Sequence, residues 1–279
     1  MPPSPSRPIP LDETRSSGEP AAAAPGGAAR RLRLGPVGID PLTFEQALDA
    51  IEALVAAHAG GSIFTPNIDH VVLAEQNPAF REAYAQASLS LVDGMPLLWA
   101  SRLLGEPLPE KISGSDLVWP LLERAGQRGW RVFLTGAAPG VAQAAADRVR
   151  RELAVDVVGT DAPRIRLPPG DGDEGEAAAA RVAAAKPDLV LVGFGAPKQE
   201  LWIHRYAASL APAVSVACGA GIDFLAGRVR RAPRIVSRVG LEWAFRLALE
   251  PRRLWRRYLV QDPKFLLILA REFRSRRRP

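Results

Sequence analysis

The chain has 279 residues, of which 47% are hydrophobic and 24% charged, a composition typical of a soluble globular protein with a sizeable core. No apolar stretch approaches the roughly 20 residues of a membrane-spanning helix, and no signal-peptide-like segment follows the start. The net charge of +6 hides an asymmetry: from Arg228 onward there are 16 Lys+Arg against 4 Asp+Glu, and the remainder carries 20 against 26. We therefore expect a cytoplasmic protein with a mildly acidic body and a basic tail that meets an anionic partner.

Three segments differ in composition. Residues 1–32 are rich in Pro, Ser, Ala and Gly, which predicts a disordered N-terminal segment. Residues 33–227 alternate short apolar runs with amphipathic stretches, and residues 228–279 form a basic appendage. The single cysteine, Cys218, excludes an internal disulfide framework and indicates a reducing compartment.

The body predicts strands that alternate with helices. The expected strands are a run beginning at Leu34, then Ser62–Thr65, Leu89–Val92, Trp130–Thr135, Val155–Val158, Asp188–Val192 and Ala213–Ala217. The expected helices are Phe44–His58 capped by Thr43, one between the second and third strands, Met95–Leu104, one capped by Ser115 or Asp116 and running through Ala125, Val141–Leu153, Glu176–Ala185 and Gln199–Ser209. This alternation predicts an α/β, Rossmann-like fold, with a mostly parallel sheet and helices on both faces.

In the basic tail, short helices rich in arginine are expected over Val236–Leu249, Leu254–Val260 and Phe265–Phe273. Basic helices with leucine and aromatic faces are typical of interfacial anchors that meet anionic lipid. The alternative is a helical cap folded on the sheet with solvated arginines. We expect part of the apolar face to pack inward and favour the anchor, because sixteen basic residues exceed what a cap requires.

The most informative stretch runs from Gly61 to Gly94. It contains two short apolar runs, the first ending in Thr65-Pro66-Asn67 and the second in Asp93-Gly94. Parallel strands joined by a helix point the same way, and ligands of open α/β sheets lie outside the carboxyl ends of the strands. Thr65, Asn67 and Asp93 are therefore expected in one crevice, where they can hold a hydroxylated substrate and remove a proton from it. The alternative for Asp93 is an N-cap for the helix starting at Met95.

Three glycine loops stand at predicted strand ends: Gly136–Gly140, Gly193–Gly195 and Gly219–Gly221. Together they favour a nucleotide-type ligand, because glycine lets backbone approach a phosphate, whereas each alone is typical of an ordinary turn. None is a dinucleotide-binding GxGxxG or a Walker loop. After the second loop, Lys198 can neutralise a diphosphate and Gln199 can hydrogen-bond a sugar. A solvated first helical turn explains the same residues equally well.

Metal and nucleophile signals are weak. Asp171-Gly172-Asp173 spells a D-x-D pattern, but it lies in a Gly/Pro-rich acidic loop with no strand before it, so a solvated loop is favoured. The three histidines lack metal-ligand spacing, and His70 is either a pocket residue or a structural one. No metal site is predicted.

Six segments in this order, TPNIDH, LVDGMPLLW, KISGSDL, FLTGAAPG, VGFGAPKQE and GAGIDFLAG, resemble the WecG/TagA/CpsF glycosyltransferases, glycosyltransferase family 26. The resemblance runs from about Leu34 to Phe273. It implies a membrane-associated, inverting, metal-independent hexosyltransferase at the inner face of the cell membrane. Such enzymes move a sugar, typically N-acetylmannosamine, from a UDP-sugar to an undecaprenyl-diphosphate-linked acceptor during synthesis of a surface polysaccharide.

The resemblance also implies roles for individual residues. Asp93 corresponds to the general base, and Thr65 and Asn67 line the same pocket. Gln199 would contact substrate, Asp223 would lie near the nucleotide, and Lys111 stands where a basic residue, often arginine, occurs. With Lys198, Gly136, Gly193 and Gly195 these form the expected substrate-binding set, with the UDP-sugar as donor and no further cofactor.

Two other functions remain open at this point. A nicotinamide-dependent oxidoreductase shares the fold class but requires the missing GxGxxG. A nucleic-acid-binding protein would use the basic tail, which contains no recognisable DNA- or RNA-binding module.

Overall fold

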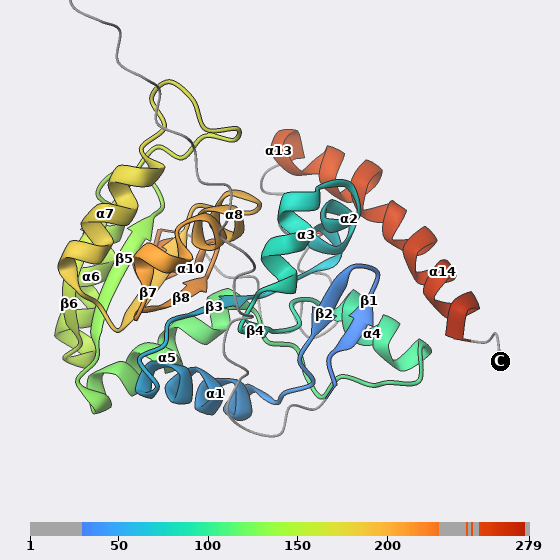
Figure 1. Cartoon of the computed structure of the whole chain (residues 1–279), viewed down its shortest axis with the longest axis horizontal. Coiled ribbons are helices and arrows are strands. Elements are labelled where there is room, and N and C mark those ends of the chain that lie inside the picture. The colour runs from blue at the N-terminus through green and yellow to red at the C-terminus, as the bar shows by residue number, and fades with distance from the viewer. Residues whose placement is uncertain (1–29, 229–243, 245–246, 248–250, 277–279) are drawn as a thin grey trace, which may run out of the picture.

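The computed structural model describes residues 30–228, 244, 247 and 251–276. Its main sheet has six strands in the order β4-β3-β8-β7-β5-β6, and every neighbouring pair is parallel. The strands are β3 (Gly61–Phe64), β4 (Leu89–Ser90), β5 (Arg131–Gly136), β6 (Asp156–Asp161), β7 (Leu189–Gly193) and β8 (Val214–Ala217). Figure 1 shows this sheet with helices around it, which confirms the predicted Rossmann-like fold class.

Helices cover the sheet and enclose a hydrophobic core on each face. One core takes side chains from α1 (Phe44–Ala56), α5 (Gly114–Arg128), α6 (Val141–Leu153) and α10 (Gly221–Leu225). The other takes them from α2 (Ile68–Gln76), α3 (Pro78–Ala85), α4 (Met95–Leu103), α7 (Gly175–Ala185), α8 (Lys198–Arg205) and α9 (Ala207–Leu210). The strands between the two cores are buried on both faces, which explains their nearly continuous apolar sequences.

The N-terminal part of the body differs from the single strand expected there. Leu32–Leu34 (β1) and Val37–Ile39 (β2) pair antiparallel as a separate hairpin around Gly35-Pro36. Gly35 has φ +57, and a Cβ built on it would lie 2.9 Å from the Ile268 side chain. The turn therefore requires glycine both for its conformation and for the helix that packs on it.

Helix starts follow local capping chemistry. Thr43 forms the predicted cap of α1, in a reciprocal capping box with Gln46. The predicted cap of α5 is wrong: the cap is Ser113, whose hydroxyl accepts from the Asp116 amide at 3.2 Å, and the helix continues to Arg128. Ser113 has extended backbone angles, which an N-cap needs, whereas Ser115 and Asp116 already lie within the helix.

Two helices expected to be continuous are each divided. The β3–β4 connection consists of α2 and α3, because Asn77 ends the first helix and caps the second, with Pro78 at its first position. The helix expected over Gln199–Ser209 ends at Arg205 and resumes as α9, with Tyr206 between the two parts.

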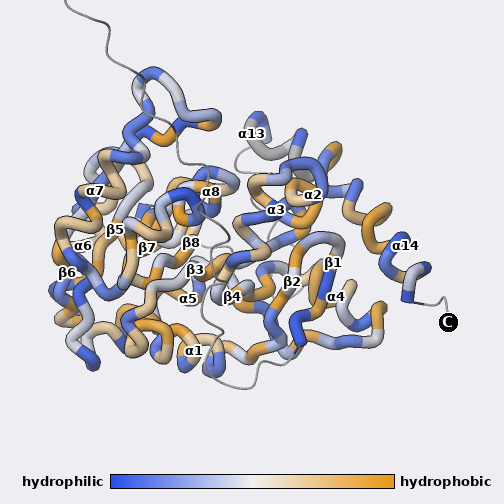
Figure 2. Tube along the Cα trace, in the orientation of Figure 1, coloured by the Kyte–Doolittle hydropathy of each residue, from blue (hydrophilic) through white to orange (hydrophobic). Residues whose placement is uncertain are grey.

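The appendage is described only in part. It contains α13 (Pro251–Arg256), a π-helical turn η1 (Arg257–Gln261), a 3₁₀ turn η2 (Asp262–Lys264) and α14 (Phe265–Arg276). α14 packs on α2 and β1 and buries Phe265 and Ile268. Figure 2 shows hydrophobic and hydrophilic residues interspersed along this helix. The expected disorder at the start, up to residue 29, and most of the expected helix Val236–Leu249 lie outside the described residues.

Candidate functional site

The ends of β3 and β4 meet beside Asp93. The two strands are paired at Ile63 with Leu89 and at Phe64 with Ser90. Beyond this short ladder the Asp93 amide donates to the Pro66 carbonyl at 2.8 Å. Thr65-Pro66-Asn67 and Asp93 therefore lie side by side at the carboxyl edge of the sheet, as the βαβ argument requires. Asp93 is half-buried, whereas Thr65 is buried.

The Asn67 side chain hydrogen-bonds to the first turn of α2, the helix that it starts. Its side-chain oxygen accepts from the amides of Asp69, at 3.0 Å, and His70, at 3.3 Å. It is the N-cap of α2 and satisfies two of the amides that a helix start leaves unpaired. Asn67 thus fixes the direction in which the chain leaves the Thr-Pro-Asn turn.

Gly114, which the sequence interpretation did not select, lies between Thr65 and β8. A Cβ placed on it would be 3.0 Å from the Thr65 hydroxyl oxygen and 2.9 Å from the Ala217 carbonyl oxygen. The start of α5 can approach both strand ends this closely only without a side chain. The sequence signal for this close packing is the glycine of KISGSDL, but sequence spacing alone does not distinguish it from an ordinary loop glycine.

Lys111 lies on a segment that runs beside the residues just before Asp93. The Ile112 amide donates to the Val92 carbonyl at 2.7 Å, and the Lys111 ammonium lies 3.6 Å from an Asp116 carboxylate oxygen. The ion pair is partly exposed, with side chains 20% and 40% accessible. This arrangement brings a cation to the same edge of the sheet as the Asp93 carboxylate.

The three glycine loops are in direct contact. Gly136 and Gly193 pair across β5 and β7, and a Cβ on Gly193 would lie 3.0 Å from the Gly219 carbonyl oxygen. Gly195 has φ +76, and its carbonyl accepts from the Gln199 amide in the first turn of α8. Lys198 opens that helix and is half-buried. The three loops therefore meet at one edge of the sheet, where glycine backbone and a helix start are suited to a phosphate-bearing ligand.

The Gln199 side chain forms hydrogen bonds with neighbouring groups of the protein. It is 4% exposed, its oxygen accepts from the Gly219 amide at 3.1 Å, and its nitrogen donates to the Glu200 carboxylate at 2.8 Å. The side chain therefore holds the β8–α10 turn against α8. Asp223 lies half-buried on α10, near enough to Cys218 to contribute, after burial, to raising the pKa of that thiol to about 12. Cys218 is accordingly a packing residue.

The sequence left His70, beside the Thr-Pro-Asn turn, as either a pocket residue or a structural one, and its buried partner Tyr84 was not identified. His70 and Tyr84 are joined through Nδ1 and the phenol oxygen at 2.7 Å. Burial first, and then the carboxylates of Glu200, Asp93 and Asp69, raise the pKa of Tyr84 well above its usual value of 10.0. The His70–Tyr84 contact joins α2 to α3. No local pattern announces it, because its members come from separate elements.

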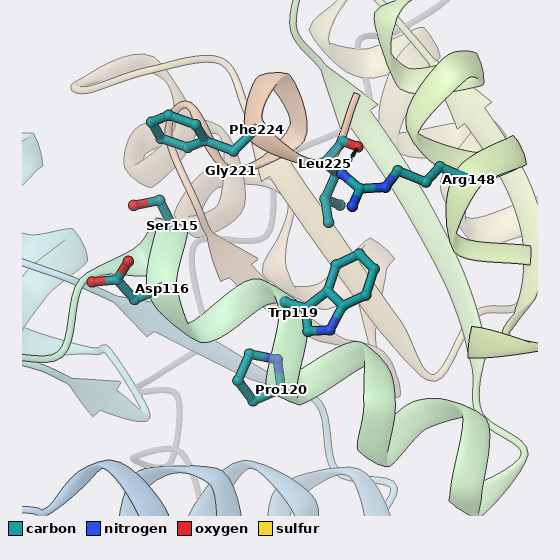
Figure 3. Close-up of a pocket in the computed structure, with 8 residues that line it drawn as sticks. All are labelled: Ser115, Asp116, Trp119, Pro120, Arg148, Gly221, Phe224 and Leu225. Carbon is teal, nitrogen blue, oxygen red and sulfur yellow. Dashed lines mark hydrogen bonds between the residues drawn. The ribbon is translucent and has the colours of Figure 1, made fainter. Parts of the chain in front are cut away.

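A cavity of about 380 Å³ adjoins the start of α5. Figure 3 shows Ser115 and Asp116 facing Phe224 across one end, with Trp119 and Arg148 toward the other. The Arg148 guanidinium lies 4.9 Å from the centre of the Trp119 ring and donates to the Leu225 carbonyl. Two of the six segments that carry the resemblance, KISGSDL and GAGIDFLAG, thus contribute to its lining.

Metal-binding geometry is missing from the part of the chain that the structure describes. There, no group of three or more His, Cys, Asp or Glu residues is arranged to hold a metal ion. The Asp173 carboxylate of the D-x-D loop accepts from the Arg166 amide at 2.8 Å and so organises its own loop.

Comparison with known proteins identifies the family of this chain. The model of the glycosyl transferase WecG/TagA/CpsF family matches residues 32–279. The chain belongs to this family. A relative from Bacillus spizizenii is 35% identical over 221 residues, which cover 79% of this chain and 82% of that protein. A second, from Bacillus subtilis, is 31% identical over 78% of this chain and 82% of its own length. Both are named N-acetylglucosaminyldiphosphoundecaprenol N-acetyl-beta-D-mannosaminyltransferase.

Membership of this family decides among the three functions left open by the sequence. The chain is a glycosyltransferase, and neither an oxidoreductase nor a nucleic-acid-binding protein is needed to account for its fold and motifs. Across the helices that the structure describes, none combines the length and apolarity needed to cross a bilayer.

Proposed function

We propose that this glycosyltransferase moves N-acetylmannosamine from a UDP-sugar to N-acetylglucosamine linked to undecaprenyl diphosphate, with inversion at the anomeric carbon. The names of the two Bacillus relatives support the sugar and the acceptor. The observation that carries the mechanism is the Asp93 carboxylate, held beside the Thr-Pro-Asn turn at the edge shared with the glycine loops. Such a product would serve synthesis of a surface polysaccharide or a related cell-wall polymer.

In the proposed reaction Asp93 takes the proton from an acceptor hydroxyl. The hydroxyl oxygen forms a bond to the anomeric carbon as the bond from that carbon to UDP breaks on the opposite face, which inverts the configuration. A general base of this kind must lie within hydrogen-bond reach of the hydroxyl and contributes about 10²–10⁴-fold to the rate. Thr65 and Asn67 border the base, and the start of α5 at Gly114 packs closely against Thr65.

The departing UDP carries negative charge that the site must offset. Lys111 and Lys198 supply cations at the proposed edge. The backbone of the Gly136, Gly193 and Gly195 loops, together with the start of the thirteen-residue helix α6, adds oriented N–H groups. Asp223 would bind the nucleotide from α10. Gln199 would act on the donor through the Gly219 turn that its side chain holds.

Replacing Asp93 tests the role of the base. We expect Asp93→Asn to lower kcat by about 10²–10⁴-fold while UDP still raises the melting temperature. Turnover is followed with UDP-N-acetylmannosamine and a short-chain lipid-diphosphate acceptor. Asp147→Asn is the matched control, because Asp147 is an exposed residue of α6 that forms an ion pair with Arg150. Near-normal turnover of Asp93→Asn would remove Asp93 as the base.

We also propose that the appendage holds the enzyme against anionic lipid at the inner face of the membrane. α14 has two faces: Phe265 and Ile268 are buried, whereas Leu266 and Leu267 are 66% and 74% exposed. Trp255, Leu259 and Val260 add exposed apolar area just before it. Apolar side chains among arginines are typical of interfacial helices.

Vesicle sedimentation tests this orientation. The double change Leu266→Ser with Leu267→Ser should reduce binding to phosphatidylglycerol vesicles. Leu167→Ser is the control, because Leu167 is a 40% exposed leucine outside the appendage. Equal sedimentation of the two variants would contradict the proposed membrane face.

A further inference from the structure

Helix α4 presents an apolar face to solvent. Its inner face packs Leu97, Leu98 and Ala100 into the core, whereas Trp99 is 50% and Leu103 58% exposed. Trp99 and Leu103 are four residues apart and therefore lie on the same side of the helix. Exposed apolar residues that are scattered singly need no explanation, but grouped ones mark an interaction surface.

The orientation of α4 is fixed by a buried hydroxyl on its inner face. The Ser101 side chain is 0% exposed, donates to the Leu98 carbonyl at 2.8 Å and accepts from the Leu108 amide at 3.0 Å. The second hydrogen bond ties the helix to the segment that follows it. A roll of α4 that buried Trp99 would therefore leave the Leu108 amide unpaired, which is costly for a buried donor.

Exposed large hydrophobic residues are concentrated on α4 and the appendage. In the part of the chain that the structure describes, eight such residues are exposed, and one of them, Leu167, lies in the loop between β6 and α7. The other seven lie on α4 or in the appendage: Trp99, Leu103, Trp255, Leu259, Val260, Leu266 and Leu267. This distribution differs from the even scatter of an ordinary protein surface.

Hydrogen bonds join the end of α4 to the end of α14. The Arg276 guanidinium donates to the Leu104 carbonyl at 3.4 Å and to the Glu106 carboxylate at 2.6 Å. It also donates to the Arg33 carbonyl of β1 at 3.1 Å, and Figure 1 shows α4 and the end of α14 beside the β1–β2 hairpin. Leu267 lies nine residues before Arg276, about 14 Å along the helix axis. The exposed apolar residues of α4 and α14 therefore belong to neighbouring elements at one end of the molecule.

Exposed cations lie around this region. Arg33, Arg102 and Arg274 are exposed, and the charge of the Glu106 carboxylate is compensated by Arg276. Tryptophan and leucine together with arginine are typical of surfaces that enter the headgroup layer of anionic lipid. A symmetric contact with a second copy of the chain would bring the same positive charges together. The charge therefore favours an anionic bilayer as the partner.

We propose that Trp99 and Leu103 of α4 insert into the headgroup layer of an anionic membrane, next to the apolar face of the appendage. Asp93 stands two residues before Met95, where α4 begins, and Trp99 lies about 6 Å along the axis from that start. α4 thereby holds the proposed base close to the bilayer, where a sugar and a diphosphate separate the acceptor hydroxyl from the lipid. The inference rests on the proposed lipid-linked acceptor and gives the body its own membrane contact.

A fluorescent label on α4 tests the contact directly. The single cysteine, Cys218, is 3% exposed, so in Leu103→Cys an environment-sensitive thiol label reacts at the new position. We expect its emission to shift to the blue when phosphatidylglycerol vesicles are added. Leu167→Cys is the matched control, at an exposed leucine outside both elements, and should show no shift. An unchanged spectrum for Leu103→Cys, or a shift that follows protein concentration without vesicles, would overturn the proposal.

The same label at Leu267→Cys separates this inference from the proposed anchoring by the appendage. A shift at position 267 without one at position 103 would leave the appendage as the anchor and defeat the contact of α4. If the label shifts at neither position, both membrane proposals fail.

Turnover supplies a second readout. We expect the double change Trp99→Ser with Leu103→Ser to lower kcat/KM about tenfold for a long-chain lipid-diphosphate acceptor in vesicles. Turnover of a short-chain acceptor in solution should stay unchanged. Equal losses with the two acceptors would contradict a role at the membrane. Absence of wild-type turnover with either acceptor would defeat the proposed function instead, because the label reports lipid contact without any reaction.

Discussion

Gly136 provides a sharp test of how the glycine loops are built. It pairs with Gly193 in the register of β5 and β7, and its φ is +116. A Cβ added there would lie 2.5 Å from the Gly193 carbonyl carbon and 2.6 Å from its oxygen. The clash is with backbone, which cannot turn away as a long side chain can.

The expected cost of Gly136→Ala follows from these two features. An L-residue in a left-handed conformation costs about 1–2 kcal/mol, and forcing an extra carbon into a packed site typically costs about 1–3 kcal/mol. We therefore expect the free energy of unfolding to fall by about 2–5 kcal/mol. Urea denaturation followed by tryptophan fluorescence measures the change.

Gly140→Ala is the matched control for Gly136→Ala. Gly140 has φ +80, but nothing lies within 4 Å of an added Cβ, so only the conformational cost of about 1–2 kcal/mol applies. Equal losses of stability in the two variants would refute the argument from the Gly136–Gly193 contact. Unchanged stability of Gly136→Ala combined with lost UDP binding would show that this glycine serves the ligand alone.

Three other predictions concern stability and reactivity. Burial raises the pKa of the Cys218 thiol from 9.0 to about 12 in the folded chain. The thiol of the unfolded chain therefore ionises first as the pH rises, and the free energy of unfolding falls above pH 9. About 1.4 kcal/mol of the fall between pH 8 and pH 10 should be absent in Cys218→Ala. If denaturation curves of the two proteins shift equally with pH, the thiol is not shielded as described. Thr43→Ala removes one half of a capping box and should lower the free energy of unfolding by about 1 kcal/mol, whereas an unchanged urea midpoint would argue against the cap. Phe265→Ala empties a buried position of α14 and should accelerate proteolytic cleavage of the appendage, and Leu267→Ala should not; identical digestion patterns would contradict the two-faced helix.

Local chemistry made much of the fold predictable. Apolar runs closed by polar residues marked the strands, and residues such as Thr43 marked helix starts. Errors arose where two local signals competed, as at Ser113 and Ser115, or where one residue both ended and started a helix, as at Asn77. The position of Asp93 beside Thr65-Pro66-Asn67 was also predictable from the sequence alone, because the strands of a βαβ unit are parallel and end at the same edge.

Tertiary structure decided which chemistry those positions share. The strand order β4-β3-β8-β7-β5-β6 brings Gly114 against Thr65 and the Gly219 amide against Gln199, and it buries His70 with Tyr84. Periodicity records which face of an element is apolar, but not which distant element covers that face. The six motifs were therefore enough to predict the family and the edge of the sheet at which Asp93 lies. The partners of each polar side chain were settled only by packing, because a buried donor or acceptor takes whichever group the folded chain brings within reach.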